Sequence, residues 1–296
     1  MAKNILHMMS SMKHMSPFDV NMALDAGFDS VTSYGSVTLD EVMPLVQDAM
    51  FSRSPRDAAR TCIFFGGNDA GLALDMMERL NATLLKPFEI SSFADPAGSF
   101  TTAAAMVACV EKILKERKGR ALAGMKILIF GATGVVGYAS GVIAALEGAN
   151  VTLAGHDGPE RVQAKANDIK KRFSVDVHAV DTSTPEKLLE VLAGAEIVFC
   201  AAKAGVQVLS APALASAKSL IVAADVNAVP PAGIEGLQLM DNGAELPGGI
   251  LGIGPLAIGD VKYKTESGLF LRLATSPTHL ALDFRDAFVL AREIIA

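Results

Sequence analysis

Tryptophan is missing from this chain of 296 residues, and tyrosine, cysteine and histidine are scarce, at 3, 3 and 5 residues. The cysteines Cys62, Cys109 and Cys200 lie far apart and form no CxxC, and the histidines show no HExxH or other ligand-like spacing. The sequence also contains no GxSxG nucleophile motif. We therefore interpret the cysteines as buried free thiols, and we predict neither a metal site nor a nucleophilic residue.

An excess of positive charge and a long apolar run are absent as well. The 26 basic and 32 acidic residues give a net charge of −6, which argues against a nucleic-acid or anionic-membrane partner. No uninterrupted apolar run approaches the roughly 18 residues that cross a bilayer. The start, Met1-Ala2-Lys3-Asn4, lacks the apolar core and cleavage site of a signal peptide. We expect a cytoplasmic protein whose length corresponds to two domains.

The most informative segment is a glycine-rich turn between an apolar stretch and an alanine-rich stretch. Residues 126–130 predict a strand and residues 135–146 predict a helix, so the turn opens a helix. Backbone N–H groups at such a turn bind the pyrophosphate of a dinucleotide. The glycine spacing is GxxGxxG rather than GxGxxG, and a glycine turn can also simply connect a strand to a helix. We favour a dinucleotide site formed by Gly131, Ala132, Thr133, Gly134, Val135, Val136 and Gly137.

A second cofactor signal follows the predicted strand at 151–154. Asp157 lies 20 residues after Gly137, where an acidic residue accepts hydrogen bonds from an adenosine ribose and repels a 2′-phosphate. This position favours NAD, while the neighbouring His156 and Arg161 would also tolerate NADP. The alternative is that Asp157 is only a turn residue in an Asp-Gly pair. Ala201, at the end of another predicted strand, is a further expected cofactor contact.

The remaining patterns predict alternating strands and helices throughout the chain. Capping signals support this, namely Ser16 before Pro17 and the capping box Thr38-x-x-Glu41. Strands are expected at 5–9, 62–65, 88–93, 126–130, 151–154, 177–180, 197–201 and 220–226. The prediction is an α/β fold with a Rossmann-type doubly wound parallel sheet at 119–279. A second, smaller α/β substrate domain is expected at 1–118, completed by the C-terminal helix at 280–296.

Two stretches rich in glycine and proline, 225–236 and 248–259, also need a structural or functional explanation. The first follows an apolar strand, and ligands of doubly wound sheets bind outside the carboxyl ends of the strands. Asp225 and Asn227 are therefore expected to hold a nicotinamide or its ribose. The alternative is an ordinary loop rich in turn-forming residues.

Together these segments resemble bacterial methylene-tetrahydromethanopterin dehydrogenase. The resemblance covers essentially the whole chain and rests on residues 13–20, 95–105, 131–137, 225–234 and 251–254. The chain resembles the NAD(P)-dependent form of methylotrophs, the B-type, more than it resembles the strictly NADP-dependent A-type. The A-type carries basic residues for the 2′-phosphate where this chain has Gly155-His156-Asp157.

This resemblance implies a hydride transfer from the methylene carbon of a reduced pterin to C4 of a nicotinamide, on the route from formaldehyde to formate. The nitrogens that flank the carbon stabilise the methenyl cation, so a general acid or base is not obligatory. The pterin is expected in a cleft between the domains. Family resemblance also implies a symmetric homo-oligomer, a trimer or a hexamer.

Candidate substrate-binding residues are polar and precede or open helices of the first domain: Lys13, Asp19, Asp69, Asp95, Ser99, Thr101 and Thr102. Each also has an ordinary interpretation, since Asp19 and Asp69 suit the first turn of a helix and the two threonines suit helix caps. The resemblance points to Lys262 as a lysine near the pterin, where it would orient the substrate. A solvated lysine is the alternative.

Three rival functions remain open. A methylene-tetrahydrofolate dehydrogenase would act on nearly the same reacting ring. A short-chain alcohol or ketone reductase would need a tyrosine followed four residues later by lysine, and Tyr34, Tyr138 and Tyr263 are followed there by Thr38, Val142 and Ser267. A non-catalytic NAD(P)-sensing protein would leave the first domain unexplained.

Overall fold

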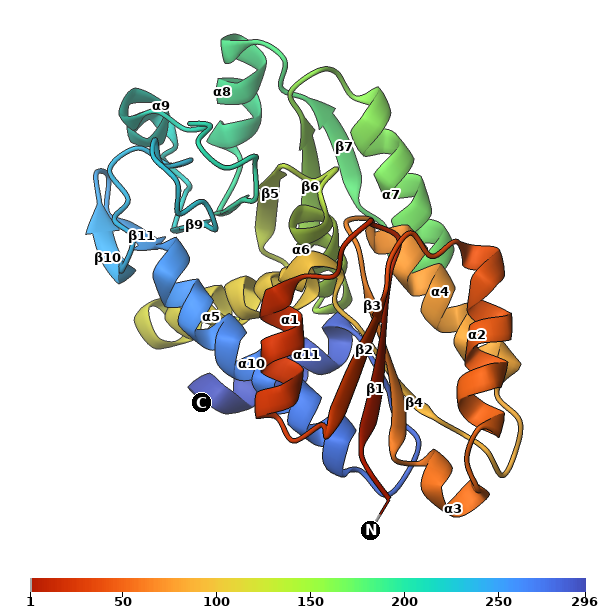
Figure 1. Cartoon of the computed structure of the whole chain (residues 1–296). Coiled ribbons are helices and arrows are strands. Elements are labelled where there is room, and N and C mark those ends of the chain that lie inside the picture. Colours follow the sequence, from red (N-terminus) through yellow and green to blue (C-terminus); the bar gives the residue numbers. More distant parts are fainter. Residues whose placement is uncertain (1) are drawn as a thin grey trace. The chain divides into compact units, whose positions relative to one another are not determined.

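The computed structural model describes residues 2–296, which form two compact units, each built on its own sheet (Figure 1). The first unit consists of residues 2–101 and 263–290, and the second of 102–262 and 291–296. The division falls within the helices α5 (Ser99–Lys118), α10 (Pro255–Thr275) and α11 (Phe284–Ile295). The domain boundaries predicted at 118/119 and 279/280, and the assignment of one domain to each substrate, remain predictions.

The first unit contains a five-stranded parallel sheet in the order β12-β4-β3-β1-β2. The strands are β1 (Ile5–Ser10), β2 (Ser30–Tyr34), β3 (Thr61–Gly66), β4 (Ser91–Ala94) and β12 (Ala281–Leu282). From β1 the chain moves outward to β2 and then returns to β3 on the other side of β1. With right-handed crossovers, α1 (Pro17–Asp25) covers one face, and α2 (Leu39–Phe51) and α4 (Ala70–Thr83) cover the other (Figure 1).

Local capping signals position these helices as the sequence predicts. Pro17 occupies the first turn of α1 after the N-cap Ser16. At α2 the carboxylate of Glu41 accepts from the backbone N–H and the hydroxyl of Thr38, each at 2.8 Å. One predicted strand was wrong at its start, because Phe88 donates its N–H to the carbonyl of Leu85 and the chain is turned there. Consequently β4 begins at Ser91.

Three phenylalanines form the centre of the first unit. Phe64 of β3, Phe93 of β4 and Phe270 of α10 are fully buried, with ring centroids 5.2–5.3 Å apart. Removing one such buried ring costs about 3–5 kcal/mol of unfolding free energy. Packing within this cluster therefore holds β3, β4 and the later part of α10 together.

The second unit contains a seven-stranded sheet in the order β10-β11-β9-β8-β5-β6-β7. Its strands are β5 (Lys126–Phe130), β6 (Asn150–Gly155), β7 (His178–Asp181), β8 (Ile197–Cys200), β9 (Val222–Asp225), β10 (Asn242–Leu246) and β11 (Ile250–Ile253). The chain winds from β5 through β6 to β7, then crosses back to β8 on the other side of β5. The helices are α6 (Val135–Leu146), α7 (Glu160–Phe173), α8 (Pro185–Ala193) and α9 (Ala211–Ser216). This confirms the doubly wound fold and places the reversal of winding beside β5.

The stretch 248–259 is not a loop, which corrects one interpretation of the sequence. Its first glycines, Gly248 and Gly249, have φ of 88° and 77° and turn β10 into the antiparallel strand β11. Gly252 lies inside β11, where a Cβ would come within 2.6 Å of Leu237 Cδ1. Pro255 then begins α10. The glycines therefore serve a hairpin and a crowded strand.

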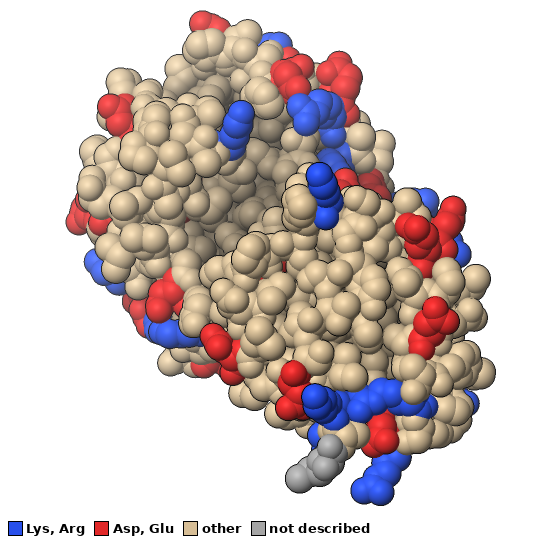
Figure 2. Space-filling model, viewed as in Figure 1, with Lys and Arg blue, Asp and Glu red and all other residues tan. Residues whose placement is uncertain are grey.

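Charged side chains of both signs share the viewed surface, and the long apolar helix is mostly buried. On the face shown in Figure 2, Lys and Arg are interspersed with Asp and Glu rather than gathered in one basic field. The stretch Pro96–Lys118 is apolar and long enough to cross a membrane by length and composition alone, and 72% of its apolar window is buried inside the protein. Such burial is typical of a core helix.

Candidate functional site

A pocket of about 630 Å³ opens at the carboxyl ends of the central strands of the second unit. Its lining comes from the segments that follow β5, β6, β7 and β8, beside the point where the winding reverses. Ligands of open α/β sheets bind at this place. The lining residues predicted from sequence are Gly131, Ala132, Thr133, Gly134, His156, Asp157, Arg161 and Ala201.

The glycine turn is shaped by close backbone contacts. Gly131 has φ of 75°, and a Cβ there would lie 2.1 Å from the carbonyl oxygen of Ala201. A Cβ on Gly137 would lie 2.6 Å from the carbonyl oxygen of Gly131. Neither position accepts a side chain, so both glycines allow the turn to pack against β8 and α6.

The N-terminus of α6 reaches this pocket through its N-cap residue, which is among the lining residues. Its N-cap is Gly134, which has no side chain to accept from the first N–H groups of the helix. These groups carry partial positive charge and have no intrahelical partner. Val135, Val136 and Gly137 form this first turn but are not among the residues that line the pocket, so their predicted contact with the cofactor stays a prediction. The turn and helix therefore fit the pyrophosphate of a bound dinucleotide.

An exposed ion pair lies at the pocket beyond β6. The carboxylate of Asp157 accepts from Arg161 Nη1 at 2.8 Å, and Arg161 Nη2 lies 3.5 Å from the hydroxyl of Thr133. The hydrogen bond from Arg161 lowers the pKa of Asp157, which keeps the carboxylate ionised. Water screens exposed ion pairs, so this one can be rearranged at little cost. The pocket thus offers both an acceptor for ribose hydroxyls and a cation for a phosphate.

Sequence reasoning missed the apolar wall of the same pocket. Leu188, Val206 and Val208 line it, with Thr182 and Lys203 as polar neighbours. These residues belong to no motif, and the signal that would have found them is their place after the carboxyl ends of β7 and β8. An apolar wall of this kind suits the planar base of a dinucleotide.

Asp225 and Asn227 do not line the pocket directly. Asp225 is fully buried and Asn227 is 4% exposed. Burial raises the pKa of Asp225, opposed by N–H donors of Asn227, Gly233 and Ile234. Their predicted contact with the nicotinamide stays a prediction, while their observed partners are backbone groups of neighbouring loops.

In the first unit, the candidate substrate residues follow the carboxyl ends of three parallel strands. Lys13 and Asp19 follow β1, Asp69 follows β3, and Asp95 follows β4. Asp69 caps α4 by accepting from the N–H of Leu72 at 2.8 Å. Asp19 is buried in the first turn of α1, whereas Lys13 is exposed.

Asp95 organises the start of α5. It is fully buried and accepts from the N–H of Phe100 at 2.7 Å and from the hydroxyl of Thr101 at 2.6 Å. Ser99 donates to the carbonyl of Ala97 at 3.5 Å. The structure thus brings Asp95, Ser99 and Thr101 together. Thr102 follows on the same helix, and Lys262 is half-buried on α10.

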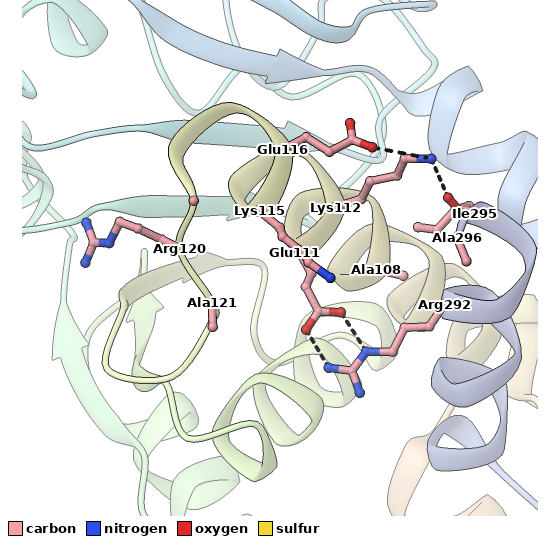
Figure 3. A pocket seen from close by; sticks show the side chains of 11 residues that line it. Ala108, Glu111, Lys112, Lys115, Glu116, Arg120, Ala121, Arg292, Ile295 and Ala296 are labelled. Atoms are coloured by element: carbon pink, nitrogen blue, oxygen red, sulfur yellow. Dashed lines mark hydrogen bonds and ion pairs between the residues drawn. The ribbon is translucent and has the colours of Figure 1, made fainter.

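A second concavity, of about 960 Å³, lies near the C-terminus within the second unit. Figure 3 shows Arg292 facing Glu111, whose oxygens accept from it at 2.5 and 2.6 Å. Lys112 lies between Glu116 and the carbonyl of Ile295. Opposite charges are paired here, and these pairs hold the end of α11 in place. The residues that line this concavity include no helix N-terminus of the kind found at the glycine-turn pocket.

Comparison with known proteins identifies relatives across the full length. The family described as "Methylene-tetrahydromethanopterin dehydrogenase, N-terminal" matches residues 17–97. The chain is 52% identical over 295 residues to the NAD(P)-dependent methylenetetrahydromethanopterin dehydrogenase of Methylorubrum extorquens, covering 99% of both chains. It is 35% identical over 294 residues to the bifunctional protein MdtA of the same organism, covering 99% of this chain and 100% of that protein.

Solved structures share the fold at low sequence identity. The shikimate 5-dehydrogenase of Listeria monocytogenes aligns with a TM-score of 0.55 at 15% identity, covering 99% of this chain and 96% of that one. The NAD-dependent malic enzyme of Thermotoga maritima aligns with a TM-score of 0.58 at 12% identity, covering 98% of this chain and 84% of that one. These similarities establish the Rossmann-like architecture alone.

Proposed function

The chain belongs to the family of methylenetetrahydromethanopterin dehydrogenases, and from this premise we propose that it oxidises methylene-tetrahydromethanopterin with NAD(P)+. The product is methenyl-tetrahydromethanopterin, and the reaction is a step from formaldehyde toward formate. The observation that carries the proposal is the identity of more than half of the residues, over the whole chain, with an enzyme of that activity. The glycine-turn pocket supplies the physical support.

The reaction demands orientation more than acid–base chemistry. A bound nicotinamide supplies a hydride acceptor at C4. No proton moves in that step, and the two flanking nitrogens of the substrate stabilise the positive charge that develops. The chain's own residues must bind the dinucleotide, hold the pterin at reacting distance and exclude water. The open N-terminus of α6 and the pair Asp157–Arg161 serve the first task, with Asp157 favouring NAD.

An exposed aromatic pair in the first unit suits the pterin ring. Phe18 and Tyr263 are 45% and 50% exposed, and their rings meet edge to face with centroids 6.4 Å apart. Phe18 lies in the first turn of α1, after the carboxyl end of β1 and next to Asp19 in the chain. We propose that this pair packs against the pterin, while Lys13, Asp19, Asp69, Asp95, Ser99, Thr101 and Thr102 bind its polar groups or hold those that do.

A second aromatic pair in the same unit provides a control for this proposal. Phe51 and Phe88 also meet edge to face, 5.5 Å apart, and Phe51 is 52% exposed at the end of α2. Phe18→Ala should raise the KM for the pterin about tenfold, as expected for a buried aromatic contact. Phe51→Ala should leave it unchanged. An equal effect of both variants would remove the pair Phe18–Tyr263 from the substrate site.

Lys262 is proposed to orient the pterin without exchanging a proton. A cation beside the developing methenyl cation would oppose the reaction, so its contribution must lie in binding. Lys262→Ala should raise the pterin requirement and leave the single-turnover rate at saturating substrate independent of pH from about 6 to 9. A wild-type rate governed by one ionisation that disappears in the variant would make Lys262 an acid–base residue.

The decisive assay mixes the purified protein with each carrier and each nicotinamide separately. We expect reduction of NAD+ and NADP+ with methylene-tetrahydromethanopterin, and a higher specificity constant for NAD+. A preference for methylene-tetrahydrofolate would establish the rival carrier, and binding of NADH without turnover of either would favour a sensor. We also propose a cytoplasmic homo-oligomer, a trimer or hexamer, which the mass of the purified protein in solution tests.

A further inference from the structure

The loop that follows β9 is organised by one buried carboxylate. Asp225 Oδ1 accepts from the N–H of Asn227 at 2.9 Å, and Oδ2 accepts from those of Gly233 and Ile234 at 2.8 and 3.2 Å. Hydrogen bonds to an ionised group are the stronger kind, and three of them close the chain between residues 225 and 234. Gly233 is required, since a Cβ there would lie 2.7 Å from Cys200 Sγ and 2.9 Å from Asp225 Oδ2.

The closed loop in turn holds a wall of the dinucleotide pocket. The carbonyl of Gly233 accepts from the N–H groups of Val208 and Leu209 at 2.8 and 2.9 Å. Val208 lines the pocket. A single residue, Gly233, therefore connects the carboxylate of Asp225 to this wall.

Asn227 makes a second connection to the same wall. Its Oδ1 accepts from the N–H of Gly205 at 3.2 Å, and its Nδ2 donates to the carbonyl of Pro231 at 2.9 Å. Gly205 lies between Lys203 and Val206, which both line the pocket. The segment 203–208 is thus attached to the loop after β9 at two points, Gly205 and Val208.

We propose that Asp225 and Asn227 are positioning residues, which fix the segment 203–208 as a wall of the dinucleotide site and do not themselves touch the nicotinamide. The proposal rests on the proposed function only for the identity of the ligand. A carboxylate whose oxygens already accept three backbone N–H groups is poorly placed to serve a ribose or carboxamide as well. Its effect on the cofactor is carried by the wall it holds.

Direct binding of NADH, measured by fluorescence, tests this without turnover. Asp225→Asn places an amide group against backbone donors and should weaken NADH binding about tenfold or more. Asn227→Ala, which leaves Asp225 in place, should weaken it by a similar factor. In both variants the KM for the nicotinamide should rise and the KM for the pterin should not. Asn150→Ala is the control, because Asn150 donates to the carbonyl of Gly124 at the amino end of β6.

The outcomes separate positioning from a merely structural role. If Asp225→Asn lowers the melting temperature but binds NADH like the wild type below that temperature, the proposal is wrong. If Asp225→Asn does not fold, Asn227→Ala decides by the same criterion. A wild-type protein that binds NADH but oxidises no pterin would refute the proposed function, whereas weaker NADH binding by the variants would still support the positioning role.

Discussion

In both units helices begin at the carboxyl ends of strands. These helices differ in which group accepts hydrogen bonds from their first N–H groups. In the first unit, Asp69 accepts from the N–H of Leu72 at α4, and Asp95 accepts from that of Phe100 at α5. In the second unit, α6 begins at Gly134, which has no side chain to offer. A carboxylate neutralises the positive end of the helix and repels anions, whereas an open end attracts them.

The contrast distinguishes a helix start that attracts anions from two whose positive ends are already neutralised. Both units contain parallel strands that are followed by polar residues, and the sequence predicts those residues alike as ligand contacts. The structure shows that several carboxylates are engaged by backbone groups of the protein. Of the three helix starts compared, only that of α6 is suited to the phosphates of a dinucleotide.

Distorting the glycine turn that leads into α6 should have the largest effect. In Gly131→Ala the new methyl would lie 2.1 Å from the carbonyl oxygen of Ala201 and would also be strained at φ of 75°. The turn must open, so NADH binding should fall at least about 100-fold, equivalent to roughly 2.7 kcal/mol. Isothermal titration with NADH measures this directly.

Gly124→Ala is the matched control for that change. Gly124 also has a positive φ, of 77°, but a Cβ would meet nothing within 4 Å. It should cost only about 1 kcal/mol of unfolding free energy and leave NADH binding unchanged. NADH affinity in Gly131→Ala equal to that of the control would mean that the dinucleotide binds elsewhere.

Removing the carboxylate that accepts from the first N–H groups of α5 should lower the stability of the protein rather than its affinity for the dinucleotide. Asp95→Asn leaves buried N–H donors of Phe100 and Thr101 facing an amide, and we expect unfolding free energy to fall by about 1–3 kcal/mol. The KM for the pterin should rise while NADH binding stays unchanged. Urea denaturation and NADH titration check the two halves. Asp69→Asn, at a helix cap that is not buried, should cost about 1 kcal/mol or less.

Cofactor choice should move by a smaller factor. Asp157→Ser removes repulsion against a 2′-phosphate and frees Arg161 to bind one, so the NADP/NAD ratio of kcat/KM should rise roughly tenfold. Arg161→Ala should shift the ratio in the opposite direction. If neither variant changes the ratio, the pair Asp157–Arg161 is only a surface contact and the preference for NAD loses its basis.

The smallest expected effect is a pH dependence from Asp225. Burial raises its pKa in the folded state above the ordinary value of about 3.9. Between those two values the folded protein binds more protons than the unfolded chain, so stability should fall as pH rises through that window. The slope from one group is at most about 1.4 kcal/mol per pH unit. Denaturation of wild type and Asp225→Asn from about pH 4 upward checks this, because the difference between their free energies of unfolding should carry the slope of Asp225 while other titrating groups cancel.

Segments with a local signal were predictable from sequence. The strand at 126–130 and the helix at 135–146 were placed at their observed ends, because the glycine turn between them fixes the register. The capping box at Thr38 likewise marked the start of α2. The hairpin of β10 and β11 was not predicted, because glycines interrupt its short strands. The role of Gly252 depends on its packing against Leu237, and that of Gly248 and Gly249 on the turn between the strands.

The candidate site was predictable only where its chemistry lies in the backbone or in a fixed spacing. The turn 131–134, together with Asp157 and Arg161, lines the pocket as expected. Leu188, Val206 and Val208 come from segments distant in sequence, and only the order of strands brings them together. For Asp225 the position after a strand was correctly recognised, but its partners Gly233 and Ile234 depend on how the loop closes.

In the proposed reaction the pterin passes a hydride directly to a nicotinamide held by this chain. Isotope transfer shows whether it does, with methylene-tetrahydromethanopterin carrying deuterium on its methylene carbon, the wild-type protein and NAD+. We predict that the deuterium appears on C4 of the reduced nicotinamide, as seen by NMR and mass spectrometry, with none lost to water. Reduced nicotinamide without deuterium, or label released into the solvent, would contradict the account.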